Sequence, residues 1–262
     1  MPTLILPPRF TDDTNLVRKA AIEAGWAVER LSGWRAPAEL RDADPVLYGE
    51  PLFAAVVADS LGLALIEPPF NWLTTVPAAR TRRYIRFMSL GDARGERSVF
   101  IKPADDKCFR ARVYDSGAEL PDASVLPDGT PVLVSEPVHW TLEFRCFVLN
   151  RQLETLSIYS RDGELAQASD GTWPATDDEI RSATRFIWEL IGDTECGLPP
   201  AVVVDIGLID ERGWAVVESN PAWGSGIYGC DPRRVLNVLR RACVRRDQLS
   251  ADDAAWIPIR AA

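Results

Sequence analysis

The sequence contains little histidine and little lysine, and both shortages limit its chemistry. Its one histidine is His139, so Ser/His/Asp and Cys/His catalysis would both depend on a single side chain at the start of an expected strand. Of the 29 basic residues, only Lys19, Lys102 and Lys107 are lysine. Because a compact ammonium and a planar guanidinium are not interchangeable, the close spacing of the last two indicates positions with a specific role.

Long apolar runs and paired cysteines are missing as well. No run of about 18 apolar residues is present, and no basic segment with a cleavage pattern begins the chain, so we expect a soluble, cytoplasmic protein without a membrane partner. The net charge of −9 argues against nucleic acid as a partner, and nothing indicates the oligomeric state. The cysteines lack zinc-site spacing and are expected to be reduced: Cys108, Cys146, Cys196, Cys230 and Cys243.

The most informative stretch is a predicted β-hairpin. Two apolar runs, 202–209 and 214–220, are predicted to be strands that flank a four-residue turn and pair from its first flanking residues outward. This register places Asp205 opposite Glu218, and because strand side chains alternate, Asn220 is expected on the same face. The other face would be apolar and packed in the core: Val202, Val204, Ile206, Leu208, Ala215 and Val217.

These three oxygen donors suit a hard cation. Two carboxylates beside an amide oxygen, without histidine or cysteine, are typical of a Mg²⁺ site, and the same set suits Mn²⁺. A hairpin with a solvated acidic face is the alternative interpretation.

The first 76 residues alternate between expected strands and helices. Strands are predicted at 3–6, 26–31, 46–48 and 63–66, and helices at 11–24 and 52–61. The pattern is βαβ-like but lacks the G-x-G-x-x-G fingerprint of a dinucleotide site. We therefore expect a supporting domain that forms one wall of a cleft.

Basic residues stand out in the next part of the chain. Residues 78–90 have helical spacing and a face of four arginines; one of these, such as Arg83, would hold an anionic substrate if it pointed into a cleft, and a solvated face is the alternative. An expected strand at 98–103 carries Lys102 near its end, where a half-buried ammonium needs a partner such as a phosphate. Lys107 follows in a loop without the glycines of a Walker-type cradle.

Further strands and one long helix are predicted downstream. An apolar strand begins at residue 131, and 140–149 form a longer strand with Glu143 and Arg145 on one face and apolar residues on the other. Such a strand would line a cleft, whereas a plain ion pair on one strand face is the alternative. A helix is predicted over 177–191. A backbone-exposing loop follows the hairpin and includes possible substrate contacts at Gly224, Ser225 and Gly226.

Four motifs together resemble the ATP-grasp superfamily, and within it the clade named for one arginine and two lysines. They are FIKPADDK at 100–107, LVSEPV at 133–138, EFRCFVLN at 143–150 and D-x12-E-S-N-P at 205–221. The last is similar to the metal triad of D-alanine–D-alanine ligase-like enzymes. The resemblance implies an α/β (α+β) protein, with a pre-ATP-grasp βαβ domain at 1–76 and an ATP-grasp domain at 77–262, whose subdomains are at about 77–135 and 136–250.

The resemblance also implies roles in binding ATP. Lys102 and Lys107 would contact its phosphates, and Lys107 would take part in catalysis. The adenine would be held by Glu136 and Val138, largely through backbone groups. Glu143 would accept hydrogen bonds from the ribose hydroxyls.

The remaining implied roles concern the metal and the reaction. Asp205, Glu218 and Asn220 would hold one or two Mg²⁺ ions, and Arg145 would stabilise the γ-phosphate or a tetrahedral intermediate. The implied activity is ATP-dependent joining of a carboxylate to an amine, on a small molecule or a peptide, through an acyl phosphate. Two alternatives are an ATP-grasp kinase that phosphorylates a hydroxyl and a nucleotide-binding module without turnover.

Overall fold

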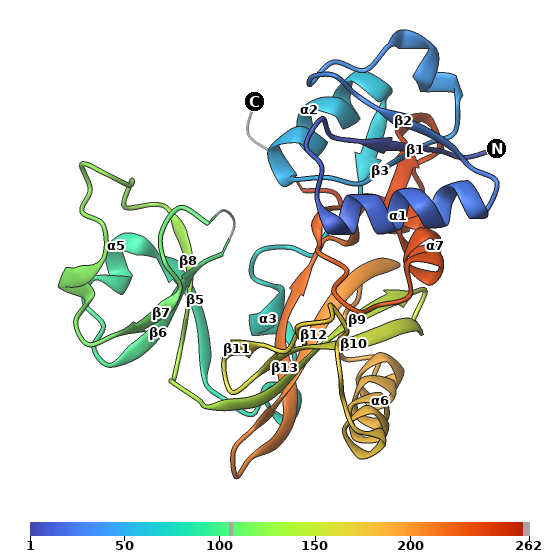
Figure 1. Ribbon diagram of the computed structural model, residues 1–262. Coiled ribbons are helices and arrows are strands. Elements are labelled where there is room, and N and C mark those ends of the chain that lie inside the picture. Colours follow the sequence, from blue (N-terminus) through green and yellow to red (C-terminus); the bar gives the residue numbers. More distant parts are fainter. Residues whose placement is uncertain (105–106, 259–262) are drawn as a thin grey trace.

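The computed structural model describes residues 1–104 and 107–258, and these residues form three parts (Figure 1). An N-terminal part carries a parallel sheet, a central part carries a five-stranded sheet, and a four-stranded sheet projects to one side. The protein is therefore a mixed α/β protein, as the sequence predicts. None of the helices in this described portion is long and apolar enough to cross a membrane.

The N-terminal part is a parallel sheet of order β2-β1-β3 flanked by α1 and α2. Helix α1 begins after Thr11, which forms a capping box with Thr14, and it buries Val17 against the sheet. Strand β14 returns from the C-terminal end of the chain to pair with β4. The elements are β1 (Thr3–Leu6), α1 (Asp12–Glu23), β2 (Ala27–Arg30), β3 (Pro45–Leu47), α2 (Pro51–Leu61), β4 (Leu63–Leu65), α3 (Trp72–Thr75) and β14 (Cys243–Arg245).

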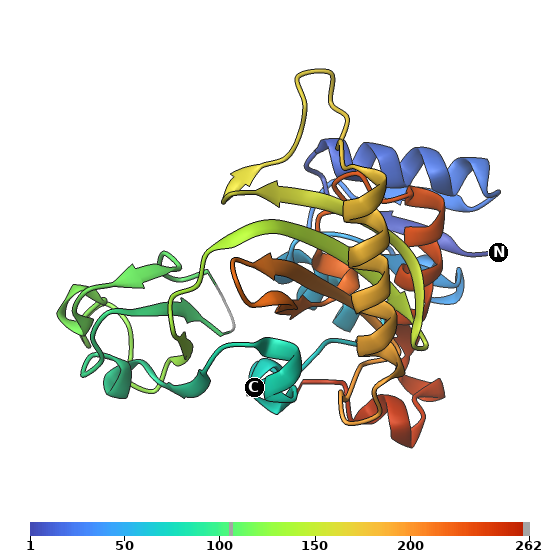
Figure 2. The ribbon, with the colours of Figure 1, turned by 90° about the horizontal axis from the view of Figure 1, so that it is seen from below.

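The central sheet is antiparallel, with strand order β11-β10-β9-β12-β13. Helix α6 crosses one face (Figure 2), where Ile187 packs with Phe144 and Val204. Helix α7 covers part of the other face and joins it to the N-terminal core through Phe147 and Val203. The elements are β9 (Trp140–Leu149), β10 (Gln152–Arg161), β11 (Glu164–Leu165), α6 (Asp177–Gly192), β12 (Ala201–Ile209), β13 (Gly213–Asn220), α7 (Pro232–Ala242) and α8 (Ala251–Ala254).

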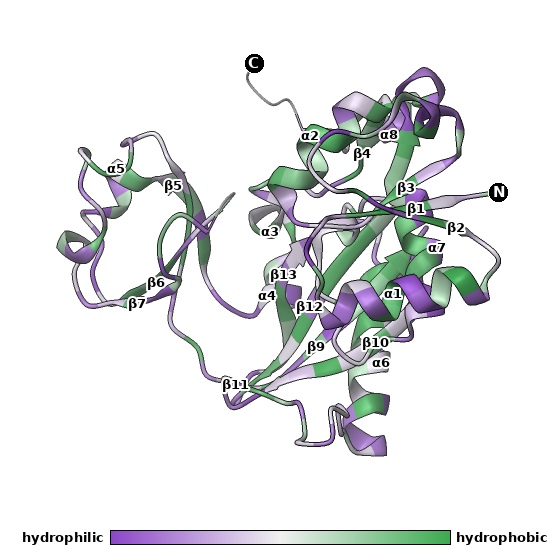
Figure 3. Ribbon diagram, turned by 45° about the horizontal axis from the view of Figure 1, so that its top comes forward, coloured by the Kyte–Doolittle hydropathy of each residue, from purple (hydrophilic) through white to green (hydrophobic). Residues whose placement is uncertain are grey.

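The four-stranded sheet has the order β5-β8-β6-β7 and a small core of its own around Ile101, Tyr114 and Val132. It lies across from the N-terminal part, with the central sheet joining the two (Figure 1). Figure 3 shows that the strands inside the protein are mainly hydrophobic, whereas α1 carries hydrophilic residues. The elements are α4 (Ala78–Thr81), β5 (Ile85–Ser89), α5 (Leu90–Ala93), β6 (Val99–Pro103), β7 (Arg112–Tyr114) and β8 (Pro131–Ser135).

The prediction of one helix over 78–90 is wrong. Helix α4 ends at Thr81, because Arg82 adopts a left-handed conformation with φ of 49°, and β5 then pairs with β8. Helical spacing of arginines was a weak signal, because the hydrogen bonds that β8 offers are absent from any local pattern. The four arginines therefore do not share one helix face.

The hairpin of β12 and β13 is confirmed, but its register near the turn differs from the prediction. Gly213 pairs with Ile209, so the turn is one residue shorter than expected. A bulge further along shifts the register by one residue, and Asp205 is opposite Glu218 as predicted. As a consequence, Trp214 and Val216 pack in the α6 core, in place of the predicted Ala215 and Val217.

Candidate functional site

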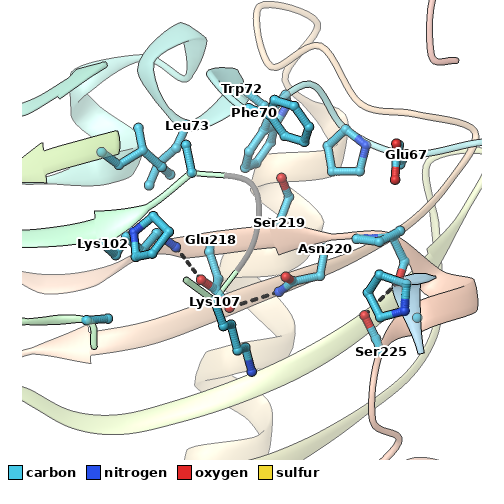
Figure 4. Close-up of a pocket in the computed structure, with 18 of the residues that line it drawn as sticks. Glu67, Phe70, Trp72, Leu73, Lys102, Lys107, Glu218, Ser219, Asn220 and Ser225 are labelled. Carbon is cyan, nitrogen blue, oxygen red and sulfur yellow. Dashed lines mark hydrogen bonds and ion pairs between the residues drawn. The ribbon is translucent and has the colours of Figure 1, made fainter. Parts of the chain in front are cut away.

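A cavity of about 1,020 Å³ lies where the three parts meet (Figure 4). The four-stranded sheet contributes Lys102 and Leu133 to its wall, and the central sheet contributes Arg145, Glu218 and Asn220. The connection from the N-terminal part and the loop after β13 complete the lining with Glu67, Pro68, Pro69, Phe70, Trp72, Leu73, Gly224, Ser225, Gly226 and Tyr228. Many of the residues singled out from the sequence therefore surround one cavity.

The three predicted metal ligands lie together at the hairpin. Asn220 Nδ2 donates to Glu218 Oε1 at 2.9 Å and to Asp205 Oδ2 at 3.3 Å. The Glu218 side chain is 31% exposed, whereas the Asp205 side chain is fully buried. Only Glu218 and Asn220 of this group line the cavity.

Lys102 of β6 forms an ion pair with Glu218 of β13 (Figure 4). Burial opposes ionisation of Glu218, but the Lys102 ammonium and the Asn220 amide outweigh it and lower the Glu218 pKa to about 2. The expectation that this lysine needs a partner is met by a carboxylate, within the described residues, on the wall of the cavity. The pair places a cation and an anion side by side where a metal and a phosphate would need them.

Arg145 binds Asp205 with both ends of its guanidinium fork. Arg145 Nε donates to Asp205 Oδ1 at 2.9 Å and Nη2 donates to Oδ2 at 2.7 Å. Nη1 donates to the Gly226 carbonyl at 2.9 Å, which ties the glycine loop to the sheet. Burial raises the pKa of Asp205 while Arg145 opposes that rise, and the same ion pair raises the pKa of Arg145 against the effect of burial.

Glu143 lies on the same face of β9 as Arg145 but does not line the cavity. Its Oε2 accepts a hydrogen bond from the Tyr159 hydroxyl at 2.7 Å. Burial raises the pKa of Glu143, although hydrogen bonds from Tyr159 and Ser160 limit the rise. The predicted alternation of β9 is confirmed, because Phe144 faces the α6 core.

Three other predicted residues lie outside the cavity lining. Glu136 forms an ion pair with Arg212 in the hairpin turn, and its backbone N–H donates to the Tyr84 carbonyl at 3.2 Å. Val138 is half-buried in the connection between β8 and β9. Arg83 donates to backbone carbonyls of β13, and burial lowers its pKa to about 10. Their predicted roles with adenine and substrate stay predictions.

The two loops singled out from the sequence both reach the cavity. Lys107 lines it from the loop after β6, while Asp105 and Asp106 of the same motif lie outside the described residues. Gly226 fits closely, because a Cβ there would come within 3.0 Å of Asp13 Oδ2. The Tyr48 hydroxyl donates to the Ser225 carbonyl at 3.0 Å, so the N-terminal part holds this loop in place.

Sequence reasoning missed an aromatic cluster around Arg145. Tyr159 and Tyr228 stack with ring centroids 5.1 Å apart, and Trp173 meets Tyr228 edge-on at 5.1 Å. The Arg145 guanidinium lies 4.8 Å from the Tyr228 ring centroid. Only the position of Tyr228 in the glycine loop hinted at a role, since the other two rings come from distant segments.

The donors present fit a divalent cation held by few protein ligands. No group of three or more His, Cys, Asp and Glu side chains within residues 1–104 and 107–258 is arranged to hold a metal. Glu218 offers a carboxylate and Asn220 an amide oxygen, once its amide turns to present Oδ1 instead of Nδ2. Mg²⁺ binds readily to one or two protein ligands when phosphate oxygens and water complete its shell.

Solved structures of the same fold define the class of protein. D-cycloserine synthetase DcsG is similar with a TM-score of 0.58 and 13% identity, over 91% of this chain and 98% of that chain. The RimK domain ATP-grasp protein from Sphaerobacter thermophilus DSM 20745 gives 0.53 and 15%, over 92% and 98%. The D-alanine–D-alanine ligase from Bacillus anthracis gives 0.52 and 11%, over 92% and 96%. The chain therefore has the ATP-grasp fold.

Its family within this fold follows from the sequence match. Residues 81–238, more than half of the chain, match the ATP-grasp domain model for family 2 of the clade named for one arginine and two lysines. The chain belongs to this family, which confirms the resemblance seen in its motifs. No curated protein matches the chain.

Proposed function

We propose that this protein is an ATP- and Mg²⁺-dependent ligase that joins a carboxylate to an amine. The observation that carries the proposal is the convergence of Lys102, Glu218 and Asn220 with Arg145 on one cavity between the sheets of an ATP-grasp fold. Family membership and the similarity to a D-alanine–D-alanine ligase and a D-cycloserine synthetase support the same reaction class.

The charges on the cavity wall suit a nucleotide triphosphate. Lys102 and Lys107 would neutralise phosphate oxygens, while Glu218 and Asn220 would hold Mg²⁺. Mg²⁺, when bound, would spread the negative charge that develops on the phosphates during transfer. Because these groups are already in place, they would act without reorganisation at the moment of reaction.

Arg145 would act on the group being transferred. Three of its five N–H donors are used by Asp205 and Gly226, which leaves two for a substrate oxygen. Its bidentate ion pair and the stacked Tyr228 ring fix its orientation. A fixed cation at this position would stabilise negative charge on the γ-phosphate or on a tetrahedral intermediate.

The reaction then needs no nucleophile from the protein. A substrate carboxylate oxygen would bond to the γ-phosphorus as the bond to the β-phosphate oxygen breaks, giving an acyl phosphate and ADP. An amine would next bond to the acyl carbon, losing a proton as phosphate leaves, and an amide would result. This route agrees with a sequence that has a single histidine and cysteines that are mostly buried.

Binding of ATP without turnover is the second candidate. The observation in its favour is that both oxygens of Asp205 are held by Arg145, which removes one of the three predicted ligands from the cavity wall. A ligase differs from this alternative in producing ADP and phosphate only when both a carboxylate and an amine are supplied.

The deciding experiment measures ATP binding and then turnover. Thermal unfolding would be followed with ATP, ADP, GTP or no nucleotide, each with and without Mg²⁺, and we expect stabilisation by ATP that depends on Mg²⁺. A panel of carboxylates and amines would then be screened for phosphate release. Stabilisation without any substrate-dependent phosphate release across the panel favours the binding module, and no response to any nucleotide contradicts both candidates.

A further inference from the structure

Arg83 bridges two consecutive carbonyls of the hairpin strand that carries Glu218. Arg83 Nη1 donates to the Val216 carbonyl at 2.6 Å, and Nη2 donates to the Val217 carbonyl at 2.8 Å. These carbonyls lie where β13 changes register, immediately before Asp205 meets Glu218. One guanidinium therefore spans the bulge.

This bulge decides which way Glu218 faces. At the turn, Ile209 pairs with Gly213, and the same register continued along the strands would place Asp205 opposite Val217. Glu218 would then be opposite Val204, whose side chain packs in the α6 core. A one-residue slip moves a side chain to the other face of a sheet, so the bulge turns Glu218 from that core toward the cavity.

A stack of neighbours holds the Arg83 guanidinium at the bulge. The guanidinium lies over the Trp140 ring, 4.9 Å from its centroid. The Trp140 ring in turn lies against Gly207, where a Cβ would come within 2.5 Å of a ring carbon. Glycine permits this close approach, and no larger residue would leave Trp140 in place. The three residues come from separate strands and segments, and they meet beside the bulge.

We propose that Arg83 is a positioning residue, which stabilises the bulge of β13 and thereby directs Glu218 and Asn220 into the cavity. It acts through the backbone and does not contact the substrate. The choice of Mg²⁺ and ATP as probes rests on the proposed function, whereas the bulge itself is tested without any ligand.

The test compares three variants. Arg83→Met keeps the length of the side chain and removes its donors, whereas Arg83→Lys keeps one point donor that cannot span both carbonyls. Arg80→Met is the matched control, because Arg80 is in the same segment and binds Glu189 at 3.1 Å and Asp193 at 3.2 Å, away from the bulge.

The first readout is amide hydrogen exchange across residues 214–220 in the ligand-free protein. We expect about tenfold faster exchange or more in Arg83→Met, since two hydrogen bonds to a charged group are lost, a smaller increase in Arg83→Lys, and no change there in Arg80→Met. The second readout is calorimetric binding of ATP with Mg²⁺ and with a chelator. Arg83→Met should weaken binding with Mg²⁺ by about tenfold or more and leave binding without metal unchanged.

Each result has a defined meaning. Equal exchange in Arg83→Met and Arg80→Met would overturn the positioning role, and so would equal weakening of ATP binding with and without Mg²⁺, which would indicate direct contact with the nucleotide. If the wild-type protein bound no ATP, the proposed function would fail, and exchange in β13 would still decide the role of Arg83.

Discussion

The Lys102 ammonium and the Glu218 carboxylate form an ion pair that joins the four-stranded sheet to the central sheet across the cavity. Each member is the group that a ligand of ATP-grasp chemistry would seek, because phosphate attracts the lysine and a metal attracts the carboxylate. Taking one partner away leaves the other half-buried and unpaired. Binding of metal and nucleotide together should therefore be more favourable than binding of either one alone.

Replacing Glu218 with Ala should abolish the Mg²⁺ dependence of ATP binding while the fold survives, since the variant removes the exposed carboxylate of the site. Calorimetric titration with ATP, with and without Mg²⁺, measures this dependence. Asp210→Ala is the control, because Asp210 is an exposed carboxylate in the turn of the same hairpin. A Glu218→Ala protein with full affinity for ATP and Mg²⁺ would remove Glu218 from the metal site.

Replacing Lys102 with Met should have opposite effects on the two ligands. ATP binding should weaken by about 2 kcal/mol or more, through loss of a charge-assisted contact. Binding of Mn²⁺ without nucleotide should strengthen, because the ammonium no longer competes for Glu218. Lys19→Met, which alters an exposed lysine on α1, should change neither. If both ligands weakened equally in Lys102→Met, the competition described above would be wrong.

Replacing Arg145 with Met should destabilise the protein by about 3–5 kcal/mol, because Asp205 would be left buried without its counter-ion. Chemical denaturation measures the loss. The double variant Arg145→Met with Asp205→Asn should recover part of it, since the unpaired charge is gone. A double variant whose loss equals the sum of the two single losses would contradict the coupling of this pair.

The N-terminus of α6 should contribute to acid sensitivity through Glu179. A hydrogen-bonded ion pair with Arg161 and the capping box with Thr176 lower the pKa of Glu179 from 4.5 to about 2, against a smaller effect of burial. Its stabilisation is therefore complete above about pH 4.5 and is lost as the pH falls toward 2.

The measurement is the free energy of unfolding from pH 6 down to about pH 2, by denaturant titration at each pH. Glu179→Gln should lose less stability than the wild type over this range, and Arg161→Met should behave similarly because the lowered pKa depends mainly on that arginine. A Glu179→Gln curve parallel to that of the wild type would assign the acid sensitivity to other groups.

The sequence by itself determined the elements whose signals are local. Strand β9 begins and ends at the predicted residues, and α6 starts at its predicted acidic turn, because alternation and capping are properties of neighbouring residues. The pairing of Asp205 with Glu218 was also predicted, although two differences cancelled: the turn was shorter than expected and the bulge restored the register.

Only the tertiary structure decided which partners the charged side chains take. Residues 85–89 form a strand because β8 is beside them, and Arg83 reaches β13 across more than a hundred residues of sequence. Arg145 takes Asp205 as its partner, while Lys102 takes Glu218. Periodicity shows which residues share a face, but an ion pair between distant segments depends on how whole sheets pack. That packing is set by burial summed over the entire chain, which no local pattern records.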